Sequence, residues 1–408
     1  MSRTRSSRRR RATGAALALG VVLLAACGSD SESSATTAAA ATTAVATASA
    51  GEATTTAAAS TAAASASTSA GSTPASTSGG DGFASTDEIA ALCADDKPDK
   101  LVFSTFAGQQ AAMGSGFDGF TAATGVTVEF LENGLSDRLT KMAAEKGSPT
   151  IDVALVPINE VPALLDNGIV EPTDTSIPNY DQLLDVAKVD GGYGASILQF
   201  GIAYNPEKVT TPPTSWSDLF DAAYAGHIAF PSMPNSGGYA ALSMLTRIAG
   251  GTDADLTPGV ELVAENKSAI DVFYPFSTAI EPQVKSGEVW IYPEIGGSAL
   301  AAAARDVPVE FVVPEEGGPA GLNTLVIPVG SDHASCAKAL VSWYLAQDMQ
   351  TLVARTLHYG TTSSTPLPAD VASSVYPQDL STLVQLDWPT IAENGPDTLD
   401  VWNSKVTG

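Results

Sequence analysis

Predicted strands and helices alternate along the chain from Lys100 onward, and this alternation restricts the fold more than any other feature. Residues 101–106 form a short apolar run, and the large side chains that follow recur at helical spacing as far as Gly125. Further strands are predicted at 126–130 and 151–156, each followed by another helix. Because strands that alternate with helices form parallel sheets covered on both faces, the predicted fold class is α/β.

Residues 286–303, with the sequence SGEVWIYPEIGGSALAAA, predict a strand over 288–292, a glycine turn and an alanine-rich helix from about Ser298. A similar turn, NSGG at 235–238, follows a predicted strand at 228–230. Ligands of open α/β sheets bind at the carboxyl ends of the strands, so both turns are expected to face such a crevice with open backbone amides. The alternative is that these are ordinary close-packed glycines.

The chain is strongly acidic. It has 20 Lys and Arg residues against 45 Asp and Glu residues, which gives a formal net charge of −25. Six of the arginines stand among the first eleven residues, so the rest of the chain is more acidic still. This charge argues against a nucleic-acid partner and against electrostatic attraction to a membrane surface.

Residues 1–26 predict a lipoprotein signal peptide. Arginines precede an apolar run at 15–26 that is too short for a membrane span and has the form of a secretory signal. The run leads into LAAC, which resembles the bacterial lipobox, so Cys27 is expected to be lipidated and to anchor the exported protein to the outer face of the cell membrane. A chance cysteine after a signal peptide is the alternative. Arg8–Arg11 leaves both Sec and twin-arginine export open.

Residues 27–87 are almost entirely Ala, Ser, Thr and Gly, and they predict a disordered tether. A flexible chain of about 60 residues has a root-mean-square reach of roughly 40–45 Å. A globular body on this tether would clear the membrane and still reach a membrane partner.

Two further cysteines, Cys93 and Cys336, predict a disulfide in an exported protein. The chain-entropy model gives a loop of this length about 5 kcal/mol at most. Two unpaired buried thiols are the alternative.

Residues 114–119 match G-x-G-x-x-G, the fingerprint of dinucleotide-binding turns. In such a turn the first glycine directly follows the strand, whereas here residues 107–113 intervene. The match therefore does not indicate a nucleotide, and no cofactor is expected.

Several segments in the order of the chain together resemble the type II solute-binding proteins of ABC importers, nearest the spermidine/putrescine- and ferric-ion-binding branch. The segments that carry the resemblance are PTIDVALVP (149–157), FGIAYNPEKV (200–209), PPTSWSDLFDAAYAGHIAF (212–230), SGEVWI (286–291) and FVVPEEGGPAGLNTLVIP (311–328). The resemblance implies a two-lobed periplasmic-binding-protein-like fold, with two interdomain crossovers and a ligand cleft.

The resemblance also implies domain bounds. Lobe I would comprise 98–201 and 295–362, and lobe II would comprise 202–294 and 363–408. Cys93 and Cys336 would then fall in the same lobe, as a disulfide requires.

Ligand-binding residues follow from the predicted strand ends and the crossovers. They are Thr105, Phe106, Pro157, Asn159, Phe200, Ser236, Gly237, Gly238, Tyr239, Tyr292, Glu294, Ser298 and Asn323. Ile295 and Ser298 stand where the polyamine branch has tryptophan and aspartate, so Glu294 alone remains as an ammonium partner.

No metal site is expected. Iron receptors of this branch use a tandem tyrosine pair, which this sequence lacks. The three histidines, at 227, 333 and 358, are scattered and are interpreted as solvated or structural.

The predicted function is capture of a small polar solute, polyamine-like or bearing a carboxylate or phosphonate, and its delivery to ABC permease subunits. The expected partners are the ligand, the permease and, through the lipid anchor, the membrane, with the protein itself a monomer. The alternatives are a ligand-sensing partner of a sensor kinase and an enzyme on the same scaffold. The sequence has neither G-x-S-x-G nor H-E-x-x-H, so no enzyme activity is predicted.

Overall fold

The computed structural model describes residues 83–408. The predicted signal peptide, Cys27 and nearly all of the predicted tether lie outside the described residues. The first helix, α1 (Thr86–Leu92), begins within the last residues assigned to the tether. Ser85 and Glu88 form a reciprocal capping box at its start, so the tether prediction extends slightly too far.

The first half of the chain confirms the predicted alternation of strands and helices. Its strands are β1 (Lys100–Thr105), β2 (Thr127–Glu132) and β3 (Val153–Pro157). Its helical segments after α1 are α2 (Gln109–Met113), η1 (Gly114–Phe117), α3 (Asp118–Thr124), α4 (Leu135–Ala144), η2 (Ile158–Glu160) and α5 (Val161–Asp166).

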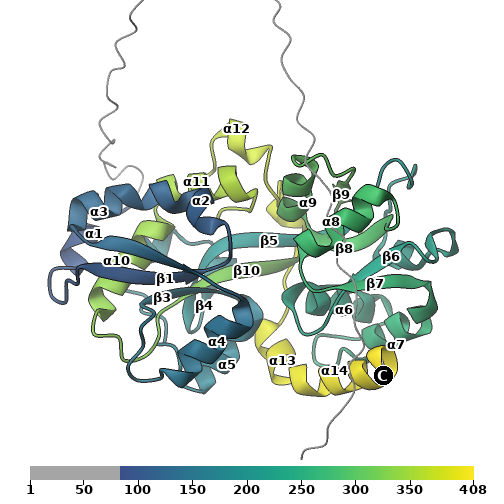
Figure 1. The fold of residues 1–408 in the computed structure, drawn as a ribbon, viewed down its shortest axis with the longest axis horizontal. Helices are drawn as coiled ribbons and strands as arrows, with labels where there is room; N and C mark the ends of the chain where they lie inside the picture. Colours follow the sequence, from purple (N-terminus) through teal and green to yellow (C-terminus); the bar gives the residue numbers. More distant parts are fainter. Residues whose placement is uncertain (1–82) are drawn as a thin grey trace, which may run out of the picture. The chain divides into compact units, whose positions relative to one another are not determined.

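A long strand, β5 (Gly192–Tyr204), joins two halves of one sheet, whose order is β2-β1-β3-β10-β5-β8-β6-β7. Its first part pairs with β10 (Gly318–Val326) and the short β4 (Lys188–Val189), and its last residues pair with β8 (Ile291–Ile295) and β9 (Glu310–Val312). We call the half with β1–β4 and β10 lobe I and the half with β6–β9 lobe II. Figure 1 shows β5 and β10 running between them.

The remaining elements complete the two lobes and a tail. Lobe II also contains β6 (Ile228–Pro231), α6 (Ser236–Ile248), α7 (Thr257–Glu265), β7 (Ile270–Tyr274), α8 (Ser277–Ser286) and α9 (Gly296–Ala303). The later elements are α10 (Ala334–Leu345), α11 (Gln347–Leu357), α12 (Ala369–Ala372), β11 (Leu383–Val384), α13 (Trp388–Glu393) and α14 (Gly395–Trp402). None of the helices in the described part of the chain is long and apolar enough to cross a membrane.

The strand directions make the two lobes face each other. β3 runs antiparallel to β10, which runs antiparallel to β5, so β3 and its parallel neighbours β1 and β2 run toward lobe II. β8 runs antiparallel to β5, and β6 and β7 run parallel to β8, so these three strands run toward lobe I. The carboxyl ends of both sets of strands therefore meet between the lobes, which is where α/β sheets bind ligands.

The expected return of the chain to lobe I at residue 295 is wrong. β8 and β9 both pair with residues 200–204 of β5, and α9 packs between them, so the chain stays in lobe II through Val312. The pairing with lobe I begins only in β10. The run at 286–294 lies in lobe II as expected, and only the pairing of β9 with β5 shows that the residues from 295 to 312 stay there too. The tail is divided between the lobes: α12 packs on α11 and α13 packs on α5, whereas α14 packs on α7 of lobe II, as expected.

The predicted glycine turn after the strand at 288–292 is also absent. The strand is shifted to 291–295 and runs directly into α9, which begins at Gly296 rather than at about Ser298. The glycines serve close packing, since a Cβ at Gly296 would lie 2.5 Å from Cγ of Tyr376.

The glycines of the G-x-G-x-x-G segment also serve close packing. A Cβ at Gly116 would lie 2.3 Å from Sδ of Met349, and one at Gly119 would lie 2.8 Å from Cζ2 of Trp343. These glycines allow η1 and α3 to approach α10 and α11 closely.

Cys93 and Cys336 are joined in the structure, and the bond links the end of α1 to α10. Both sulfur atoms lie within the buried cluster of lobe I, with Phe103, Phe117 and Tyr344 nearby. The pairing therefore lies within one lobe.

Candidate functional site

Most of the predicted ligand residues lie where the two sets of strand ends meet, and we call this region the interlobe site. The lobe I side follows β1 and β3 and includes Thr105, Phe106, Pro157 and Asn159. The lobe II side follows β6 and β8 and includes Ser236, Gly237, Gly238, Tyr239, Glu294 and Ser298.

Phe200 and Asn323 connect these two sides. A Cβ at Gly237 would lie 3.6 Å from Cε1 of Phe200, and one at Gly321 would lie 2.7 Å from its Cε2, so the ring lies between the start of α6 and β10. Asn323 is opposite Pro157 in the sheet and donates a 3.1 Å hydrogen bond to Oγ of Ser196. The crossing strands thus place residues from both lobes beside one another.

Glu294 is a buried carboxylate without a cationic partner among the described residues. Only 6% of the residue is exposed. Its carboxylate accepts hydrogen bonds of 2.7 Å from the Ser277 hydroxyl and from its own neighbour, the Ile295 amide. Burial raises the pKa of Glu294 to about 7, because no nearby positive charge offsets the lost hydration.

Ser298 and Tyr359 lie next to this carboxylate. The Ser298 hydroxyl is hydrogen-bonded to the phenol of Tyr359, whose pKa is raised first by burial and also by the charge of Glu294. Phe276 follows the carboxyl end of β7, directly precedes Ser277 and is 62% exposed. Sequence reasoning missed both aromatic residues, because neither stands in a recognisable motif.

Two predicted ligand residues are core residues instead. Tyr292 is 1% exposed and packs edge-to-face on Tyr274, with 6.0 Å between the ring centres. Thr105 is fully buried, and its hydroxyl donates to Oε1 of Gln109 at 2.5 Å. Successive strand residues point to opposite faces, and these two point into packed layers.

The start of α6 is only partly open to an anion. Oδ1 of Asn235 accepts a 2.8 Å hydrogen bond from the Gly238 amide, which is therefore already satisfied. Tyr239 is 6% exposed, and a Cβ at Gly395 would lie 3.1 Å from its hydroxyl. The amides of Ser236 and Gly237 have no intramolecular acceptor in the described structure.

Glu160 is a second carboxylate at this site that sequence reasoning missed. It accepts a 2.8 Å hydrogen bond from Nδ2 of Asn159, and its pKa is raised by burial. Oδ1 of Asn159 is buried and has no partner among the described residues. Tyr239 lies in lobe II, and the pKa of its phenol is raised mainly by burial and to a smaller extent by the charge of Glu160.

Arg138 lies beneath the lobe I side of the interlobe site. It is fully buried, and its guanidinium carbon lies 4.6 Å from the centre of the Phe106 ring. Burial lowers its pKa to about 10. The helical spacing of α4 places residue 138 on the buried face of the helix. Because arginine normally lies at the surface, the sequence alone does not predict that this charge is buried.

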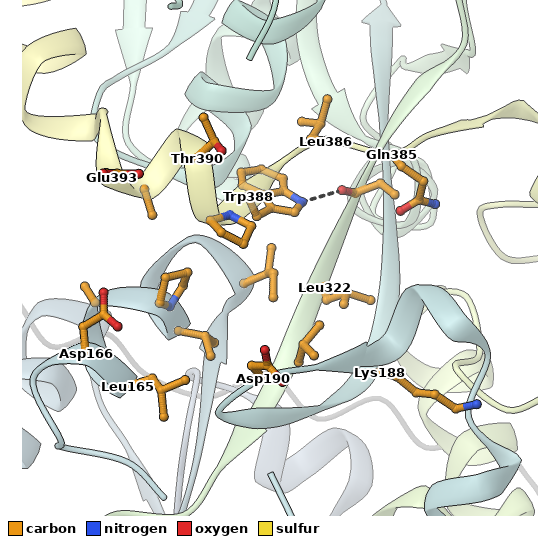
Figure 2. Close-up of a pocket in the computed structure, with 18 of the residues that line it drawn as sticks. Leu165, Asp166, Lys188, Asp190, Leu322, Gln385, Leu386, Trp388, Thr390 and Glu393 are labelled. Atoms are coloured by element: carbon orange, nitrogen blue, oxygen red, sulfur yellow. Dashed lines mark hydrogen bonds between the residues drawn. The ribbon is translucent and has the colours of Figure 1, made fainter. Parts of the chain in front are cut away.

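A separate cavity of about 870 Å³ lies between α5, the turn after β4, β10 and α13 (Figure 2). Figure 2 shows the Trp388 indole N–H donating to the Ala320 carbonyl, at 2.9 Å. None of the predicted ligand residues lines this cavity. Its carboxylates, on Asp166, Asp190 and Glu393, are exposed, and exposed charges contribute little to binding.

Within residues 83–408 no group of three His, Cys, Asp or Glu side chains is arranged to hold a metal ion. Each histidine has a structural contact. His227 stacks on Trp290 at 3.7 Å, His333 Nδ1 lies 3.2 Å from Asp152, and His358 Nδ1 lies 2.9 Å from the carbonyl of residue 374.

Residues 117–378 match the model of the bacterial extracellular solute-binding protein family. The chain belongs to this family. That membership confirms the resemblance to solute-binding proteins, and the two-lobed α/β fold agrees with it.

This solute-binding protein is similar to two groups of named periplasmic proteins. It is 27% identical over 197 residues to the spermidine/putrescine-binding periplasmic protein of Escherichia coli (strain K12), a match that covers 46% of this chain and 54% of the relative. The chain thus spans about half the length of that relative. It is 24% identical over 267 residues to a Salmonella typhimurium protein named "Putative 2-aminoethylphosphonate-binding periplasmic protein", covering 63% of this chain and 74% of the relative.

Solved structures share the fold of this solute-binding protein. An ABC transporter structure from Clostridium perfringens ATCC 13124 superimposes with a TM-score of 0.66 at 21% identity, over 75% of this chain and 99% of the other. The structure of the Atu4243-GABA receptor gives a TM-score of 0.65 at 22% identity, over 74% and 96% of the two chains. At these identities the likeness shows the fold alone.

Proposed function

We propose that this protein is the extracytoplasmic receptor of an ABC importer and captures a small solute that carries an ammonium group. Family membership supports the receptor role. Its relatives are named for polyamines and for an aminophosphonate. These compounds share an amino group and differ in the rest of the molecule.

The observation that carries the proposal is Glu294. An isolated carboxylate is costly to bury, and proteins normally pair it with a cation or protonate it. No cation among the described residues pairs with Glu294, which lies near the carboxyl end of β8, the end that faces lobe I. An ammonium ligand would provide the missing charge and would restore the ionised carboxylate.

Closure of the two lobes would bury the bound solute. The crossing strands β5 and β10 are the connections about which the lobes can move, and a closed pair of lobes would present a surface to the permease. In this proposal Cys27 carries the lipid that keeps the receptor at the membrane, and the Cys93–Cys336 bond pins the first helix to lobe I.

Calorimetric titration with a panel of amines, amino acids and aminophosphonates tests the proposal. Wild-type protein is expected to bind at least one amine, and Glu294→Gln is expected to weaken that binding at least tenfold. Glu288→Gln removes an exposed carboxylate just before the same strand and serves as the matched control, with unchanged affinity expected. Equal affinity in wild type and Glu294→Gln, or binding only of solutes without an amino group, would refute the proposal.

A further inference from the structure

Arg138 is a buried cation without a counter-ion. Its side chain is fully buried, and no carboxylate among the described residues lies within ion-pair distance. Its hydrogen bonds go to three neutral oxygens: the Ser104 hydroxyl at 2.9 Å, the Leu155 carbonyl at 2.8 Å and the Asn133 carbonyl at 3.1 Å. Charges removed from water in this way are normally paired.

The surroundings add to the cost of this charge. Arg138 is the fourth residue of α4, near the helix end whose dipole is positive and favours negative groups. The three neutral acceptors join β1, β3 and the residue after β2, so the guanidinium also has a structural role, for which it needs its fork of donors.

The charge of Arg138 lies directly behind the ring of Phe106. Phe106 directly follows β1 and is partly exposed, whereas the guanidinium beside it is fully buried, so Arg138 covers the inner side of the ring. A ligand group on the outer side of the ring would lie roughly 8 Å from the guanidinium. At that distance in a partly desolvated site, a unit charge changes affinity by roughly 10- to 30-fold.

Neither carboxylate of the site neutralises Arg138. Glu294 lies on a strand end of lobe II, and Glu160 follows β3 and is hydrogen-bonded to Asn159. The pKa of Arg138 is lowered by burial alone, and no carboxylate raises it. The positive charge therefore acts on a ligand through space, across the Phe106 ring, and not by direct contact.

We infer that Arg138 determines the charge preference of the lobe I side of the interlobe site, which disfavours a second ammonium group and favours a carboxylate or phosphonate. The inference rests on the proposed function and deepens it. The ligand is then an amino acid or aminophosphonate in the broad sense, with its ammonium at Glu294 and its anionic group toward Phe106. A diamine would place an ammonium group against the guanidinium.

The test uses three probes of similar length: 4-aminobutyrate, 2-aminoethylphosphonate and 1,4-diaminobutane. Wild-type protein is expected to bind one of the two zwitterions at least tenfold more tightly than the diamine. Arg138→Met should reduce that ratio about tenfold or more, while Arg138→Lys, which keeps the charge, should retain it. Lys141→Met removes a partly exposed charge one turn along the same helix and should leave the ratio unchanged.

A tighter wild-type affinity for the diamine would overturn the inference and leave the proposed function standing. Equal weakening of all three probes by Arg138→Met would show a structural role only and would also overturn it. Failure of the wild type to bind any amine, including the panel above, would reject both proposals. The wild-type comparison needs no variant, so it decides the matter even if Arg138→Met does not fold.

Discussion

The hydroxyl of Ser277 donates a 2.7 Å hydrogen bond to the carboxylate of Glu294, which joins the first residue of α8 to the end of β8. A neutral hydroxyl and a single amide are all that stabilise this buried charge within the described residues. The unliganded protein therefore carries an electrostatic cost that a bound cation would relieve.

This cost predicts a pH dependence of stability. The pKa of Glu294 is about 7 in the folded protein and near its ordinary value of 4.5 in the unfolded chain. Because the folded state holds the proton more tightly, stability is greatest below pH 4.5 with respect to this group and falls as pH rises through 7. The loss is of the order of 3 kcal/mol.

Urea unfolding of unliganded wild type and Glu294→Gln at pH 5 and pH 8 measures this effect. The variant should be more stable than wild type at pH 8 and should differ less from it at pH 5. A stability difference that does not change with pH would contradict the prediction.

The same titration predicts pH-dependent binding. An ammonium group pairs only with the ionised carboxylate, so the affinity for the tightest-binding amine of the panel should increase severalfold between pH 6 and pH 8. The increase should be absent in Glu294→Gln. Calorimetry in buffers of different ionisation enthalpy would also show proton release from the protein on binding at pH 6.5.

Gly297 is expected to tolerate no side chain. A Cβ there would lie 2.6 Å from the His358 carbonyl oxygen, which is backbone and cannot rotate away. Gly297→Ala should therefore destabilise the protein by about 1–3 kcal/mol. The matched control is Gly114→Ala, where the nearest atom would be 3.6 Å away, in ordinary contact. Thermal unfolding of both variants checks the prediction, and equal melting temperatures would refute it.

Loss of the Cys93–Cys336 bond should destabilise the protein by about 2–5 kcal/mol, because the bond closes a long loop of the unfolded chain. The double substitution Cys93→Ser and Cys336→Ser should lower the midpoint of urea unfolding. Reductant should lower the wild-type midpoint to the same value and leave the variant unchanged. A wild-type protein that is insensitive to reductant under unfolding conditions would show that the thiols are not joined.

The fold could be predicted from the sequence because its signals are local. The alternation of strands and helices in lobe I, the stop at Gly125 and the extended run around Phe200 each depend on residues that are close in the chain. The strand and helix at 286–303 were less predictable. Its apolar run is compatible with several strand bounds, and the contacts of Tyr376 and His358 with its glycines come from distant parts of the chain.

The sequence by itself determined the fold class and the alternation of strands and helices in lobe I, and it singled out Glu294 as a candidate ligand residue, since hydrophobic periodicity and a lone acid at a strand end can be recognised without coordinates. Only the tertiary structure decided that Tyr292 and Thr105 belong to the core, that the carboxylate of Glu160 is buried while Phe276 is exposed, and that Arg138 lies buried without a counter-ion. The physical reason is that burial and charge pairing depend on segments far apart in sequence. A residue's own neighbours in the chain do not specify which segments will surround it.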